Sequence, residues 1–76
     1  MKLTPIAANQ NEVQFTNGTQ VFFSYKTPVA AYCPSSGYIR TATKWSSTTS
    51  RHINKWLEGV TAIEVNQEEL NNLVAG

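Results

Sequence analysis

The sequence predicts a small α+β domain in which an antiparallel sheet of three to four strands is packed by helices on one face. The first half of the chain alternates apolar and polar side chains around Asn17-Gly18, a dipeptide typical of hairpin loops. The second half holds two segments with apolar residues at helical spacing. With 76 residues there is room for a single domain, residues 1–76, and flexibility of an N-terminal segment at residues 1–10 is left open.

The first hairpin turns at Thr16-Asn17-Gly18, and its register follows from the apolar pattern. A three-residue loop puts Val13 on the face of Val21, whereas a two-residue loop would put it on the face of Phe22. The longer loop gathers more apolar side chains on one face. We therefore expect Gly18 to adopt the left-handed conformation that glycine reaches without steric cost.

Two further strands follow the hairpin. Residues 29–33 are predicted to be a strand with Pro28 as its first residue, because proline has no amide hydrogen for a ladder bond. After a turn at residues 34–37, a fourth strand is expected over residues 38–45. Its core face carries Ile39, Thr41, Thr43 and Trp45, and its solvent face carries Tyr38, Arg40, Ala42 and Lys44.

A helix is predicted near residues 49–58, after hydroxyl residues suited to capping and before Gly59, which favours a helix end. Its apolar residues should pack on the sheet, and these are Ile53, Trp56, Leu57 and Val60. Its outer side carries Arg51, His52 and Lys55.

A short acidic helix is predicted near residues 67–74, capped by Asn66 and with an apolar stripe of Leu70, Leu73 and Val74. The sequence leaves open whether this helix docks on the body or forms an arm.

Several function classes are excluded by composition. No apolar stretch approaches the roughly 20 residues of a membrane-spanning helix, so no membrane partner is expected. One cysteine, Cys33, one histidine, His52, and no aspartate leave too few ligands for a metal, and no glycine-rich phosphate loop occurs. We expect no cofactor and no enzyme activity, because Cys33 and His52, the one thiol–imidazole pair, are not expected to meet.

Charge is segregated along the chain. All six basic residues precede position 56, and four of the five acids follow it. This basic body suggests DNA or RNA binding as an alternative function, although the acidic C-terminal segment could neutralise the same charges internally. The residues of that alternative are Tyr38, Arg40, Lys44, Arg51 and Lys55.

The first expectation is a non-enzymatic protein-binding module. Phe22, Tyr32 and Tyr38 fall on the sheet face assigned to solvent. With helices on one face, the other face must meet a partner or a second copy. The expected binding residues are this face together with the edge formed by Arg51, His52 and Lys55, and a homo-oligomer is expected.

Two segments resemble a family of small uncharacterised proteins of tailed bacteriophages, including phages of cyanobacteria. They are residues 21–30, which read VFFSYKTPVA, and residues 44–57, which read KWSSTTSRHINKWL. No activity is established for that family, so the resemblance implies a setting and no site residues. The setting is an accessory protein made in the host bacterial cytoplasm that acts by binding a host or phage protein.

Overall fold

The computed structural model describes residues 2–75, and the side chains of residues 2–74. These residues form six strands and two helices. In chain order they are β1 (Lys2–Ala7), β2 (Gln10–Gln14), β3 (Gln20–Ser24), β4 (Thr27–Cys33), β5 (Gly37–Thr41), α1 (Ser47–Leu57), β6 (Ile63–Val65) and α2 (Gln67–Ala75). The strands lie in one sheet in the order of the chain, antiparallel from β1 to β5 and parallel between β5 and β6. The α+β class is therefore confirmed, but the expectation of three to four strands is too low.

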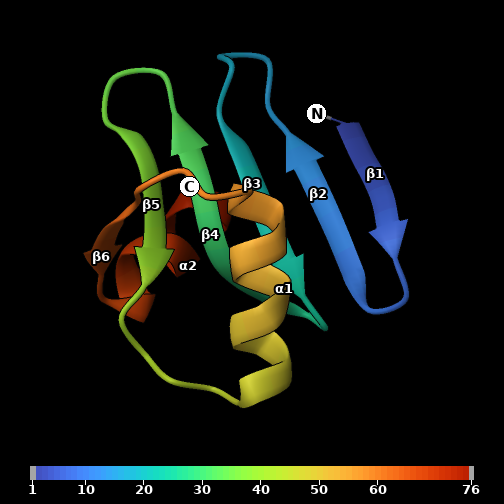
Figure 1. Ribbon diagram of the computed structural model, residues 1–76. Coiled ribbons are helices and arrows are strands. Elements are labelled where there is room, and N and C mark those ends of the chain that lie inside the picture. The colour runs from blue at the N-terminus through green and yellow to red at the C-terminus, as the bar shows by residue number, and fades with distance from the viewer. Residues whose placement is uncertain (1, 76) are drawn as a thin grey trace.

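The uncounted strands are the two edges of the sheet (Figure 1). Every side chain of β1 is exposed, and the strand contains Pro5, so it lacks the buried alternation that marks a strand in a sequence. β6 has three residues, within the short extended piece that the sequence indicates at residues 61–65. Edge strands are held by backbone bonds more than by side-chain burial, and their pattern is correspondingly weak.

The predicted register of the first hairpin is confirmed. Val13 pairs with Val21, and the Gly18 amide donates to the Phe15 carbonyl at 3.1 Å. Gly18 has a φ of 94°, a conformation that strains any residue with a Cβ. The loop thus takes the longer form, which places Val13 and Val21 on one face.

Pro28 lies inside the central strand β4, where an irregularity accommodates it. Phe22 pairs with Ala30, but the next residue, Phe23, pairs with Pro28, so Val29 has no opposite residue. A bulge of this kind is the usual way to seat a residue that cannot donate a ladder bond. It also lets the consecutive residues Val29 and Ala30 join the same buried cluster.

The helices cover opposite faces of the sheet, with α1 in front and α2 behind in Figure 1. Ile53 and Leu57 of α1 pack on Phe22, whereas Leu70 of α2 packs on Val21. The expectation of helices on one face is therefore wrong. The reason is that consecutive residues of a strand point to opposite faces, so apolar runs such as those in β3 and β4 need cover on both.

Both helices begin at side-chain caps: the Asn66 cap is the predicted one, whereas α1 begins at Ser47, two residues before the predicted start near residue 49. Ser46 Oγ accepts the Thr49 amide at 3.1 Å, and Asn66 Oδ1 accepts the Glu69 amide at 3.0 Å. Capping satisfies amides that the first turn leaves without a helical partner. The acidic helix α2 is docked, because its Leu70 is fully buried against the sheet.

Two residues expected in the core, Trp45 and Val60, lie at the surface. β5 ends at Thr41, not at Trp45, and the Trp45 side chain is 50% exposed. Its indole nitrogen donates to Gln67 Oε1 at 3.1 Å, which ties the loop after β5 to α2. Val60 is also exposed, because α1 ends at Leu57 and the chain turns away through Gly59, with a φ of 84°.

Candidate functional site

Phe22, proposed from the sequence as a binding residue on the solvent face, is fully buried. α1 covers that face, and the Phe22 ring stacks on Trp56 with centroids 5.3 Å apart. Trp56 is held in place by a hydrogen bond from its indole nitrogen to Glu12 Oε1 at 2.9 Å. Phe22 therefore stabilises the packing of α1 and cannot contact a partner, which corrects the sequence assignment.

Tyr38 belongs to the same aromatic cluster and is half-buried. Its ring lies 4.8 Å from that of Tyr32 and meets Trp56 edge-on at 6.0 Å. The sequence placed Tyr32 and Tyr38 on a bare face, but the structure uses Tyr38 to close the end of the cluster under α1.

The basic residues of the nucleic-acid alternative lie on β5, in the loop before α1 and on α1 itself. Arg40 Nη1 donates to Asn54 Oδ1 of α1 at 3.1 Å, and its buried Nε has no hydrogen-bond partner in the described part of the chain. Lys44 is exposed in the loop that leads to α1. Arg51 and Lys55 are exposed one turn apart on α1. The helix thus presents two neighbouring cations, while Arg40 serves to link β5 to α1.

His52 joins a buried polar cluster between β3 and α1 that the sequence analysis missed. Ser24 Oγ lies 2.9 Å from His52 Nδ1 and 3.4 Å from Thr49 Oγ1. A serine beside an imidazole is the arrangement of nucleophilic catalysis. Ser24 is only 2% exposed, so no substrate carbonyl reaches its hydroxyl. The pair instead fixes the helix to the sheet. The two residues are 28 positions apart in the chain, so no local pattern indicates their contact.

Cys33 and His52 lie at opposite ends of β4, as expected. Cys33 ends that strand, whereas the partner of His52, Ser24, pairs with Thr27 at its start. A strand of this length separates them by about 20 Å. Burial raises the pKa of the Cys33 thiol, which disfavours the thiolate that nucleophilic chemistry needs.

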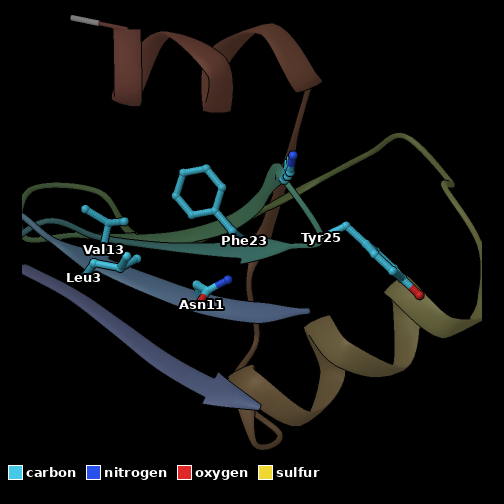
Figure 2. Close-up of a pocket in the computed structure, with 6 residues that line it drawn as sticks. Leu3, Asn11, Val13, Phe23 and Tyr25 are labelled. Carbon is cyan, nitrogen blue, oxygen red and sulfur yellow. The ribbon is translucent and has the colours of Figure 1, made fainter. Parts of the chain in front are cut away.

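An open apolar surface lies over β1–β3 on the face that α2 only partly covers. Figure 2 shows Val13 and Phe23 on the side of the sheet that faces α2. There a hollow of about 290 Å³ is lined by Leu3, Asn11, Val13, Phe23, Tyr25 and Lys26. We call this surface the β1–β3 face. This face was not expected from the sequence, because the side of the sheet with Phe22 and Tyr38 was assigned to solvent.

One row of paired residues explains why this face is apolar and bare. The row crosses all six strands on the α2 side and consists of Leu3, Val13, Val21, Ala31, Ile39 and Ile63. Leu70 of α2 seals its middle, where Val21 and Ala31 are fully buried. The two ends, Leu3 and Ile63, are each 63% exposed. The apolar alternation of β2 and β3 indicated an apolar face of the sheet, but it did not show how much of that face α2 would cover.

The rim of the β1–β3 face is polar. Lys26 lies at the end of the hollow beside Tyr25, which has a φ of 59° and points away from Phe23 toward α1 (Figure 2). On the other side runs α2, whose first turn carries exposed Glu68 and Glu69. An apolar floor with a charged rim is the usual organisation of a protein-binding surface.

Within residues 2–75, no group of three or more potential metal ligands lies together. Neither described helix has the length and hydropathy needed to cross a bilayer.

Residues 1–72 match the Family of unknown function (DUF8033). The chain belongs to this family. It has no match among curated proteins and none among solved structures. The match covers both edges of the sheet and most of α2, so the elements that form the β1–β3 face all lie within the family's span.

Proposed function

We propose that this protein is a non-enzymatic binding module that attaches to another protein through the β1–β3 face. The observation that carries the proposal is the exposure of Leu3 above a hollow that also contains Val13 and Phe23. Covering apolar area releases about 25 cal/mol per Å², so a contiguous patch of this kind favours association. The expected surface moves from the Phe22 and Tyr38 face, which α1 covers, to the opposite face of the sheet.

The chemistry of the side chains supports a binding role over catalysis. The Ser24 hydroxyl beside His52 is buried between β3 and α1, and the Cys33 thiol is disfavoured as a thiolate. For the setting, we propose a phage accessory protein that acts on a host or phage protein in the bacterial cytoplasm. The support for this is the resemblance of residues 21–30 and 44–57 to small phage proteins.

Self-association was expected because the Phe22 face was taken to be bare. Since α1 covers that face, this reason for a homo-oligomer no longer applies. A second copy on the β1–β3 face is the remaining route, and light scattering on purified protein measures it directly.

The test compares Leu3 and Ile63, two apolar residues of similar size and equal exposure on the same face of the sheet. Leu3→Glu and Ile63→Glu alter the opposite ends of the same row, with the same exposed fraction of 63%. Tagged wild-type protein and both variants are used to capture partners from bacterial lysate, and the captured protein is then purified and titrated. We expect Leu3→Glu to weaken the purified pair at least tenfold and Ile63→Glu to leave it unchanged. Circular dichroism and urea midpoints confirm that both variants are folded.

The proposal fails if every purified interactor binds Leu3→Glu as tightly as the wild type. It also fails if the protein binds a short random-sequence duplex or single strand with strong salt dependence while no protein interactor depends on Leu3. A steep salt dependence is the signature of phosphate contacts.

A specific observation favours nucleic acid as the second candidate function. Arg51 and Lys55 stand one turn apart on the outer side of α1, and Lys44 is exposed in the preceding loop. Like charges at this spacing repel, and phosphate would relieve that repulsion. Alanine at Arg51 and Lys55 should then reduce DNA or RNA affinity and flatten its salt dependence. Unchanged affinity would remove this candidate.

A further inference from the structure

The β1–β3 face has the width of one helix. On this side of the sheet α2 packs on β4 and β5, and within residues 2–75 no second helix lies beside it over β1 and β2. Strands are about 4.8 Å apart, so the strip between β1 and β3, whose Val21 is already buried under Leu70 of α2, is about 10 Å wide. A helix with its side chains is about 10–12 Å across. One helix next to α2 would complete the layer.

A strand is a poor occupant, because Pro5 obstructs the free edge of β1. The Phe15 amide donates across the hairpin to the Thr19 carbonyl at 2.8 Å. Amide direction alternates along a strand, so Glu12 directs its amide to β1, and its partner Thr4 faces inward. Pro5, the next residue, therefore faces the free edge, where it has no amide hydrogen to offer an added strand.

The size of the face also argues against a second copy of the whole domain. A stable protein–protein interface takes about 20–30 residues from each side. The hollow is lined by six residues, and α2 stands beside it as a wall. A narrow, elongated partner fits such a strip better than a second globule.

The charge of the rim indicates the chemistry of the helix. Leu73 of α2 lines a hollow together with Phe15 and Thr19, so this side of α2 faces β3. Glu69 lies one turn before Leu73 and is therefore on the same side, whereas Glu68 is rotated by about 100° from Glu69 and points away from the sheet. α2 contains no lysine or arginine. A helix lying beside α2 therefore meets an acidic side of α2, formed by Glu69.

We propose that the β1–β3 face binds one amphipathic helix of a protein partner, with an apolar stripe on Leu3, Val13 and Phe23 and basic residues along the flank next to α2. This inference rests on the proposed function and names the partner's chemistry. The partner helix contacts the β1–β3 face through its residues spaced at i, i+3, i+4 and i+7, as helices do in apolar grooves.

The test uses two synthetic helical peptides of 18 residues with the same leucine stripe, one with lysine along one flank and one with glutamate. Amide resonances of the isotope-labelled protein are followed by NMR during titration. We expect the basic peptide to bind about fivefold more tightly than the acidic one, as a few exposed charge pairs provide. Its shifts should lie in β1–β3 and α2.

Four variants separate the contributions. Leu3→Glu should abolish binding, while Ile63→Glu should not. Glu68→Lys combined with Glu69→Lys should reverse the preference toward the acidic peptide, whereas Glu64→Lys, an exposed acid on β6, should leave the preference as it is.

The inference is overturned if neither peptide shifts β1–β3, if the acidic peptide binds the wild type more tightly, or if Leu3→Glu binds as well as the wild type. A dimer in light scattering that Leu3→Glu dissolves would show that a second copy occupies the face. The protein-binding function would survive that result, whereas the absence of any Leu3-dependent protein partner would remove the function itself.

Discussion

Truncation of Leu70 tests whether α2 is a packed layer or a loose arm. Leu70 is fully buried against the sheet, where it packs on Val21 and Ala31. Leu70→Ala removes three carbon groups, each worth about 0.8 kcal/mol of burial, and leaves a cavity. We therefore expect the free energy of unfolding to fall by about 2.5–5 kcal/mol. A domain of this size has about 4–11 kcal/mol in total.

The assay is urea unfolding followed by tryptophan fluorescence, with Val74→Ala as the matched control. Val74 lies in the same helix but is exposed, so its truncation should cost less than about 1 kcal/mol. The two variants change helix propensity in the same direction, which leaves burial as the difference between them. If Leu70→Ala lowers the free energy of unfolding no more than Val74→Ala does, α2 does not pack on the sheet. The placement of its acidic side next to the β1–β3 face would then have no basis.

Three further predictions concern the α1 face and the cysteine. Trp56→Ala should cost about 3–5 kcal/mol in urea unfolding and Trp45→Ala less than about 1 kcal/mol, because only the first stacks in the core; equal costs would contradict this assignment. Ser24→Ala should cost about 1–3 kcal/mol, because it removes a buried partner of His52; an unchanged unfolding midpoint would show that the cluster is not structural. Alkylation of Cys33 should be slower in the folded than in the urea-unfolded protein near neutral pH, because burial raises its thiol pKa; equal rates would contradict that direction. Because the folded pKa of Cys33 is raised, its thiol ionises in the unfolded chain first as pH rises. The contribution of this group to the free energy of unfolding is therefore fully present below the ordinary thiol range and is lost as pH rises through that range.

The sequence predicted an apolar binding surface with charged residues at its edge, but not which face of the sheet would carry it. Phe22 and Phe23 are adjacent, equally apolar and on opposite faces, and nothing local distinguishes which one a helix covers. α1 stacks Trp56 on Phe22, while Phe23 lines the hollow. Arg51 and Lys55 were placed correctly on the outer side of α1, because helical spacing determines which residues share a side. His52, which was predicted beside them, instead meets Ser24 on the sheet side.

The two tryptophans show the same limit. Both were expected in the core, yet Trp45 follows the end of β5 and hydrogen-bonds Gln67 at the surface. The end of β5 depends on how far β6 pairs with it, and Thr41 pairs with Val65 at the last position of both strands. Such pairing joins residues that are distant in the chain, so no local pattern reports it.

What the sequence by itself determined is local. The Asn17-Gly18 turn, the Asn66 cap and the burial of Ile53 and Leu57 in α1 and of Leu70 in α2 follow from bonds and spacings within a few residues. The tertiary structure alone decided that the helices take opposite faces, that β1 and β6 complete the sheet, and that the β1–β3 face remains bare. Those outcomes depend on the competition among apolar surfaces for two short helices. On its face α1 extends as far as Ile6 of β1, whereas α2 lies over β4 and β5 and leaves the β1–β3 face bare.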